Sequence, residues 1–387
     1  MSTTILILGG GTGGIMTTAG LRKKLSSKTR NGEVKIILFE KEKDNVFAPS
    51  LLWLMVGKRK SGQVFRKTSF IKRKGIEVVQ GDIESINPAD KSITVNGKTY
   101  NGDYVVVSLG TDYTTEHNLD KFGCDFFTLI GANAFYEKLQ MFNAGKIIIL
   151  ISSLPFKCPA APYEAAMLIE NFIRKKGIRD KTEISLYTPE TLPMPVAGKE
   201  LGSTVQMMLE QKGIRYFPQH QLQNAAENTL TFISTGGSEI AEYDLLAYTP
   251  EHQCPSVLKT TALVGKSGWV EVNRNTMETN FPNVYAIGDN TFIPLEMGKP
   301  LPKAGVFAHY QAQVVAHNIA EKINGGNKFR SFDGQGQCFL EMGHGKAGYA
   351  GGNFYASPVP IVKLKSPGFI WHWAKLWFEK YWWFKYF

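Results

Sequence analysis

The stretch TILILGGGTGGIMTTAGL, residues 4–21, decides the fold of this chain. An apolar run ends in glycines at positions 9, 11 and 14, a helix-like run follows, and a second apolar stretch, VKIILFE, ends at Glu40. Gly9 permits the tight turn, Gly11 lets the backbone approach a pyrophosphate, and Gly14 lets the helix pack on the strand. Glu40 is placed to accept hydrogen bonds from a ribose. This order predicts a βαβ unit that binds a dinucleotide.

The composition is that of a folded enzyme with more than one domain. The chain has 387 residues, of which 43% are hydrophobic and 20% charged, and its 38 glycines indicate many tight turns. The net charge of +10 favours an anionic partner surface, but no run of five Lys or Arg occurs, so no nucleic-acid partner is expected. The first strand begins too early for a signal peptide, and no stretch approaches 18 apolar residues. We expect a protein in the cytoplasm or on a membrane facing it.

Two later stretches indicate which dinucleotide is bound. YNGDYVVVSLGTDY, residues 100–113, is an apolar strand that leads to Gly110, and TNFPNVYAIGDNT, residues 279–291, leads to Gly288 and Asp289. In large flavoproteins a strand of the second kind brings an Asp to the ribityl and pyrophosphate end of FAD. A buried strand followed by a Gly-Asp turn is the simpler alternative. The return of the motif late in the chain predicts an FAD domain that is split by an insertion.

The start of a long helix completes the expected FAD site. Lys303 precedes AGVFAHYQAQ, in which Gly305 opens the helical pattern. Backbone donors at a helix start face electron-rich groups favourably, so this one is predicted to stabilise negative charge on the reduced flavin ring.

The inserted block begins a second βαβ unit whose turn has lost its glycines. KIIILISS is followed by the turn LPFKCPAAP, by a helical stretch, and by the strand TEISLYT. Without glycine, and with prolines that lack an N–H, this turn is unsuited to a pyrophosphate, so NAD(P)H binding is inferred to be lost. The predicted fold is α/β with two Rossmann-like domains, the second inserted in the first. The predicted boundaries are 1–145 and 271–330 for the FAD domain, 146–270 for the insertion, and 331–387 for a C-terminal region.

Five motifs together resemble those of the sulfide:quinone oxidoreductases and the related flavocytochrome c sulfide dehydrogenases. They are GGGTGG, KCPAAPYEAA, VYAIGD, LPKAGVFAHYQAQVVAHNIA and the terminal WAKLWFEKYWWFK. The resemblance covers nearly the whole chain and implies FAD-dependent oxidation of sulfide to polysulfide or sulfur, with electrons passed to a quinone. A flavocytochrome c type dehydrogenase, a type II NADH:quinone oxidoreductase and a flavin-binding scaffold without turnover remain alternatives. The second turn argues against the NADH enzyme, since its relatives keep glycines there.

The resemblance implies a redox pair formed by Cys158 and Cys338. A helix start lowers a thiol pKa, and the neighbouring Lys157 is expected to add to this effect, whereas simple packing is the alternative role. Cys124 corresponds roughly to a third cysteine, which assists sulfur release in some relatives and links the flavin in others. Cys254 is expected to be structural. No cysteine spacing fits zinc, so no metal site is expected. Since TLPMPVAGKE contains no histidine, no general base is assigned.

The last 19 residues, 369–387, are rich in Trp, Phe and Tyr interleaved with Lys and Glu. Such a helix is typical of an anchor that lies in the membrane interface without spanning it, and a core-packed terminal helix is the alternative. By resemblance, Phe378 and Lys375 line the path of the quinone and Glu296 lies near its head group, unless Glu296 is a solvated carboxylate. A peripheral protein on the cytoplasmic face of the cell membrane is predicted, and homo-oligomerisation is left open.

Overall fold

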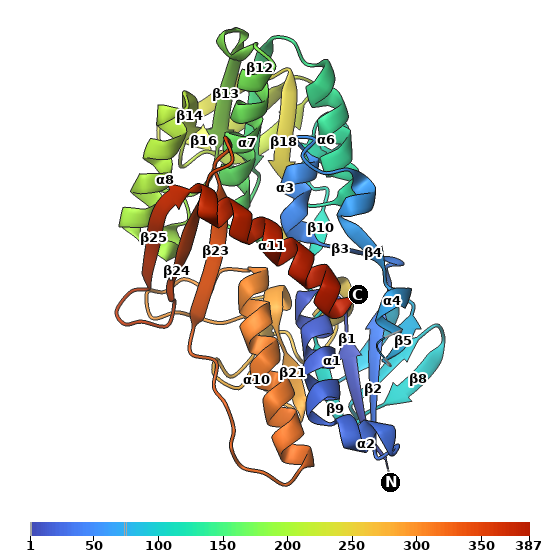
Figure 1. Ribbon diagram of the computed structural model, residues 1–387. Coiled ribbons are helices and arrows are strands. Elements are labelled where there is room, and N and C mark those ends of the chain that lie inside the picture. Colours follow the sequence, from blue (N-terminus) through green and yellow to red (C-terminus); the bar gives the residue numbers. More distant parts are fainter. Residues whose placement is uncertain (1, 73, 75) are drawn as a thin grey trace.

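Two five-stranded parallel sheets organise the chain, in a computed structural model that describes residues 2–72, 74 and 76–387 (Figure 1). The first sheet has the strand order β21 (Val284–Ala286), β9 (Tyr104–Val107), β1 (Thr3–Leu8), β2 (Val34–Glu40) and β5 (Glu77–Gln80). The second has the order β11 (Cys124–Asp125), β18 (Leu245–Thr249), β12 (Gly145–Ile151), β13 (Thr182–Tyr187) and β14 (Ile214–Phe217). This is the predicted pair of Rossmann-like units.

The glycine loop between β1 and α1 (Thr12–Lys24) folds as its sequence requires. Gly9 has a φ of +96°, which disfavours residues with a side chain, and a Cβ on Gly14 would lie 1.8 Å from the Gly9 carbonyl oxygen. The long helix α10 (Gly305–Ile323) packs beside α1, so close that a Cβ on Gly20 would come within 2.9 Å of Ala316. The late segment of the chain therefore completes the first domain, as predicted.

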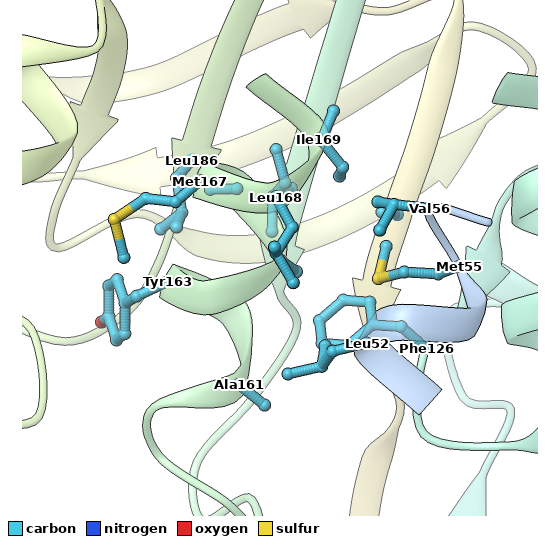
Figure 2. Packing of buried hydrophobic residues seen from close by; sticks show 14 of the residues in the cluster. Leu52, Met55, Val56, Phe126, Ala161, Tyr163, Met167, Leu168, Ile169 and Leu186 are labelled. Atoms are coloured by element: carbon cyan, nitrogen blue, oxygen red, sulfur yellow. The ribbon is translucent and has the colours of Figure 1, made fainter. Parts of the chain in front are cut away.

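The second sheet is covered by α6 (Leu129–Met141), α7 (Ala161–Lys175) and α8 (Lys199–Gln211) (Figure 1). Its core also receives α3 (Leu51–Leu54) from the first third of the chain. Figure 2 shows Leu52, Met55 and Val56 beside Phe126 and the α7 residue Leu168. An early segment thus fastens the two domains together through buried apolar contacts.

The structure shifts both predicted limits of the inserted domain. β11 already belongs to the second sheet, so this domain starts before residue 146. Cys254 and Trp269 pack in the core below the first sheet, so the domain ends before residue 270. The predicted limits rest on the βαβ motif alone. β11 joins the sheet at its far edge through a long-range pairing with β18, which that motif does not reveal.

A three-stranded antiparallel sheet and a terminal helix complete the molecule. β23 (Gln335–Glu341), β24 (Ala347–Asn353) and β25 (Ile361–Gly368) lead into α11 (Phe369–Tyr386), which crosses the face of the molecule between the two Rossmann-like units (Figure 1). Within the described residues, no helix is both long enough and apolar enough to cross a bilayer.

The remaining elements are short connections and small sheets. They are α2 (Ser26–Arg30), β3 (Asp44–Val46), β4 (Phe65–Lys67), α4 (Ser69–Lys72), β6 (Ile83–Asn87), β7 (Ser92–Val95), β8 (Lys98–Asn101), β10 (Asp112–Thr114), α5 (Leu119–Phe122), β15 (Gln221–Ala226), β16 (Thr229–Ser234), β17 (Gly237–Glu242), β19 (Glu251–Gln253), α9 (Ser256–Lys259), β20 (Val270–Glu271) and β22 (Thr291–Phe292).

Candidate redox site

The glycine loop leaves open the space that a pyrophosphate needs. A Cβ added to Gly11 would meet nothing within 4 Å, and the same holds for Gly110, which has a φ of +70°. Glu40 turns its carboxylate back to the loop, where Oε2 accepts a hydrogen bond from the N–H of Gly10. Burial raises the pKa of Glu40. The loop, the acid and the open space lie together as the sequence predicted.

Buried polar atoms without partners gather at the same edge of the first sheet. They are Thr111 Oγ1, Asp289 Oδ1 and Asn290 Nδ2, which follow the neighbouring strands β9 and β21. A buried polar atom without a partner costs about 1–3 kcal/mol, so such a group indicates a ligand that supplies hydrogen bonds. The ribityl hydroxyls and phosphates of FAD supply them, and the residues present therefore fit this cofactor. FAD is the cofactor of the chain.

Lys303 stands beside Asp289 without a carboxylate partner of its own. Its Nζ donates to the carbonyl oxygens of Asp289 at 2.7 Å and Thr291 at 3.1 Å, and lies 3.3 Å from the centroid of the Trp269 ring. Burial lowers the pKa of Lys303 to about 8. Gly305 begins α10 two residues later, so the structure brings Lys303, the helix start and Asp289 together as expected.

The structure brings Cys158 and Cys338 to one cavity of about 520 Å³. Cys158 follows β12 in the second domain, and Cys338 lies on β23 of the antiparallel sheet. Both are free thiols that are reached from the cavity, and Lys303 lines its wall as well. Two cysteines that are 180 residues apart in sequence therefore meet next to the residues that hold the flavin.

The two thiols are weaker acids than the sequence suggested. Both side chains are exposed to the cavity, but the protein packed around it limits their hydration. This desolvation and the nearby Glu164 carboxyl raise the pKa of Cys158 to about 12, and the same causes raise the pKa of Cys338 to about 12. The expected lowering is wrong for two reasons. Cys158 lies three residues before α7 with a left-handed φ of +55°, so it is not at the helix start, and Lys157 turns its Nζ to the Tyr113 ring, 5.0 Å from the centroid.

A buried ion pair lies behind the two cysteines. Lys375 of α11 donates to Glu164 Oε1 at 2.8 Å, and the same oxygen accepts the N–H of Glu341 at 2.7 Å. Lys375 opposes the effect of Glu164 on the pKa of both thiols. The structure thus places Lys375 at the cysteine site, and it does not line the cavity as a quinone path residue.

The other predicted residues lie apart from the cavity. Cys124 is buried on β11 in the core of the second domain, so it is not placed for sulfur release. Glu296 is exposed in a turn and does not line the cavity either. Phe378 on α11 packs against Phe47, with ring centroids 5.7 Å apart. Cys254 is buried in the core of the first domain, which agrees with a structural role.

The family model described as "Pyridine nucleotide-disulphide oxidoreductase" matches residues 3–312. The chain belongs to this family. Curated relatives include a mitochondrial sulfide:quinone oxidoreductase of Mus musculus, which is 24% identical over 92% of this chain and 79% of the relative. A sulfide-quinone reductase of Aquifex aeolicus is 24% identical over 98% and 90% of the two chains. A type II NADH:quinone oxidoreductase of Staphylococcus aureus is 22% identical over 83% of each.

Solved structures of the family show the same fold. The sulfide:quinone oxidoreductase of Aquifex aeolicus superposes with a TM-score of 0.89 at 24% identity, covering 100% of this chain and 91% of the other. NDH2 from Plasmodium falciparum in complex with NADH gives 0.73 at 13% identity, covering 97% and 94%.

Sequence reasoning missed one acidic residue of this family member, Glu190. It follows β13, the second strand of the inserted βαβ unit, and lines the cavity that contains the cysteines. The signal was weak: Glu40 is the last residue of the second strand of the first unit, whereas Glu190 lies three residues beyond the end of β13. Tyr163 of α7 donates its hydroxyl to Glu190. No sequence pattern links these two residues, so this contact could not be predicted.

Proposed function

We propose that this flavoprotein oxidises sulfide and passes the electrons to a quinone. The observation that carries the proposal is the pair Cys158 and Cys338 on one cavity, with Lys303 of the flavin site in its wall. The relatives whose names state this activity support it, and their matches cover nearly the whole chain.

The two cysteines do the sulfur chemistry. Hydrosulfide attacks one sulfur of an oxidised Cys158–Cys338 disulfide, the S–S bond breaks, and one cysteine becomes a persulfide while the other leaves as a thiolate. FAD supplies a two-electron acceptor beside the pair, and the quinone finally takes up those electrons. Lys375 stabilises the thiolate, because its ammonium group opposes the burial that otherwise keeps both thiols protonated. Repeated turnover lengthens the sulfur chain until polysulfide or sulfur leaves through the cavity.

The second βαβ turn supports sulfide rather than NADH as the electron donor. The N–H of Cys158 is bonded to the carbonyl oxygen of Lys303 at 2.6 Å, and the N–H of Ser152 to Thr249 Oγ1 at 3.1 Å. Pro155 and Pro159 have no N–H to offer. Four of the backbone positions in this turn therefore offer no free N–H to a nicotinamide pyrophosphate.

Membrane attachment through α11 belongs to the same proposal. The helix buries Lys375 and Glu379 and turns a stripe of large apolar side chains outwards, of which Ile370 is 69%, Trp373 68%, Trp377 64% and Phe384 83% exposed. Aromatic side chains on an exposed helix face favour the interfacial zone of a bilayer, where a lipophilic quinone also resides. We propose a peripheral protein on the cytoplasmic face of the cell membrane.

An anaerobic titration tests the function. Sulfide should bleach the oxidised flavin absorbance of the purified protein, and a short-chain quinone added afterwards should restore it. A flavin that sulfide leaves oxidised would contradict the proposal. Reduction by sulfide without reoxidation by quinone would instead favour electron transfer to a haem partner, as in the flavocytochrome c type enzymes.

A further inference from the structure

The sulfur chemistry needs a proton acceptor inside the cavity, and this requirement rests on the proposed function. Hydrogen sulfide is a weak acid that is still partly protonated at neutral pH, and only its anion is a strong nucleophile. The cysteines cannot serve as acceptors when hydrogen sulfide arrives, because in the proposed step their sulfurs are joined in a disulfide, which has no thiolate to take up a proton. Another side chain in the wall has to accept the proton.

The cavity wall offers one group of that kind. Among its described lining residues, Glu190 is the one carboxylic acid, and no histidine lines it. The ionisable groups beside it are the ammonium groups of Lys299 and Lys303 and the two thiols. The other acids near the cysteines are engaged, since Glu164 pairs with Lys375 and Glu341 with His372, at 2.8 Å in each case.

The surroundings of Glu190 keep its carboxyl group able to exchange a proton. The side chain is 5% exposed, and no Lys or Arg of the described residues lies within ion-pair distance. Tyr163 of α7 donates its hydroxyl to Oε2, and the Thr188 hydroxyl lies 3.5 Å from the same oxygen. Lys299 contributes favourable charge from farther away. The Tyr216 ring of β14 lies behind Tyr163, with centroids 6.5 Å apart.

These contacts give Glu190 a pKa suited to the task. Burial raises the pKa of Glu190 to about 7, while the hydroxyls of Tyr163 and Thr188, the charge of Lys299 and the backbone at Met194 act in the opposite direction. A proton acceptor works best when its pKa lies near the operating pH.

We propose that Glu190 takes the proton from hydrogen sulfide that enters the cavity, and so generates the hydrosulfide that attacks the cysteine pair. In this step one S–H bond breaks and one carboxyl O–H bond forms, giving HS⁻ and the neutral acid, with no change of oxidation state. Glu190 returns the proton to water before the next hydrogen sulfide molecule arrives.

Stopped-flow reduction of the flavin by sulfide at pH 7 and pH 9 tests the step. The variant Glu190→Gln keeps the size and the hydrogen bonds of the side chain but accepts no proton. We expect it to be at least fivefold slower than wild type at pH 7, where a large share of Glu190 is ionised and neutral hydrogen sulfide, which enters an apolar cavity more readily than its anion, is abundant. At pH 9, where hydrosulfide prevails, the variant should stay within about twofold of wild type. The matched control Glu200→Gln, an exposed acid in the first turn of α8, should follow wild type at both pH values.

Two further variants separate proton transfer from a structural role. Glu190→Asp should restore part of the rate at pH 7, because it returns a carboxylate to the wall. Tyr163→Phe should move the acidic limb of the profile to higher pH, since the Tyr163 hydroxyl holds the Glu190 pKa down. FAD content and the far-ultraviolet spectrum are measured for each variant.

The outcomes are distinct. An equal loss at pH 7 and pH 9 in Glu190→Gln, or no loss at pH 7, overturns the role of Glu190 while wild type is still reduced by sulfide. A wild-type protein that sulfide does not reduce at either pH overturns the proposed function and this inference together.

Discussion

At the scale of single residues, the site combines thiols that resist ionisation with one ammonium group that opposes this resistance. Cys158 and Cys338 share a cavity, and the charge of Lys375 opposes the rise in the pKa of both thiols. A cysteine pair arranged in this way reacts when it is oxidised, because a disulfide needs no prior ionisation to accept a nucleophile.

The cysteine assignment predicts a clear difference between three alanine variants. Cys158→Ala and Cys338→Ala should each lower sulfide-dependent flavin reduction at least a hundredfold, with FAD still bound, because a single thiol forms no disulfide. Cys124→Ala is the matched control and should stay within about twofold of wild type, since Cys124 lies in the core of the second domain and does not line the cavity. Anaerobic stopped-flow absorbance measures all three. Turnover like that of wild type in either of the first two variants would remove the pair from the mechanism.

Glu190 also predicts a pH dependence of stability. Its pKa is about 7 in the folded protein, above the ordinary value of 4.5, so the folded state binds the proton more tightly than the unfolded state. The stability from this group is present below pH 4.5 and is lost as the pH rises through 7, by roughly 3 kcal/mol at most. Glu190→Gln should therefore unfold at higher urea concentration than wild type at pH 8 and not at pH 4.5. An unchanged difference between the two pH values would contradict the raised pKa.

At the scale of elements, α11 turns three ionisable side chains towards the body and several large apolar ones outwards. His372, Lys375 and Glu379 lie on its inner face and pair with Glu341, Glu164 and Arg59 of the body. Breaking one buried ion pair costs about 3–5 kcal/mol, so deleting this helix would damage the cysteine site as well as any membrane contact. Substitutions on the outer face are the cleaner test.

The outer face of α11 predicts membrane attachment by apolar contact. The triple variant Trp373→Gln, Trp377→Gln, Phe384→Gln should move the protein from vesicles to the soluble fraction, because burying such rings is worth several kcal/mol at roughly 25 cal/mol per Å². Reduction by sulfide should persist, since these side chains point away from Lys375. Flotation with lipid vesicles gives the readout, at low and high salt.

The exposed apolar residues Ile130 and Met141 of α6 provide the control for that experiment. Changing both to Gln should leave flotation unaltered. Release of the wild-type protein by salt alone would mean that the charge of +10 holds it, and the assignment to α11 would fail.

At the scale of the whole molecule, two Rossmann-like domains of similar build perform different tasks. The first keeps its glycine cradle and unpaired polar atoms for FAD. The second has turned its dinucleotide turn into part of the wall of the cysteine cavity, which also contains Leu154, Pro155 and Phe156. The proposed function uses this wall for small sulfur species, where a second dinucleotide would bind in a Rossmann unit with a glycine-rich turn.

This architecture predicts that neither NADH nor NADPH reduces the flavin. Two backbone donors of the second turn are engaged with Lys303 and Thr249 and the turn has no glycine, so we expect it to form no pyrophosphate cradle. Either nucleotide at micromolar concentration should leave the flavin absorbance unchanged over minutes, while sulfide bleaches it within the same time. Rapid bleaching by NADH would indicate a type II NADH:quinone oxidoreductase instead.

The sequence by itself determined what depends on local pattern. The glycines at 9, 11 and 14 require close backbone contacts, and the apolar strands and acid around them follow the period of a βαβ unit, so the fold and the FAD site were readable from the chain. By the same logic the glycine-free turn predicts that no second dinucleotide binds. Cys158 and Cys338 were paired by family resemblance, not by any local signal.

Tertiary structure alone decided the rest, because contacts between distant segments leave no periodic trace in the chain. It placed Lys375 against Glu164 behind the cysteines, and it buried Cys124 in the core of the second domain. It also raised the pKa values of the two thiols, because desolvation depends on how the whole fold packs around a group. Glu190 became the one acid in the cavity wall, among the residues described, for the same reason: its neighbours come from α7, β14 and the turn that contains Lys299.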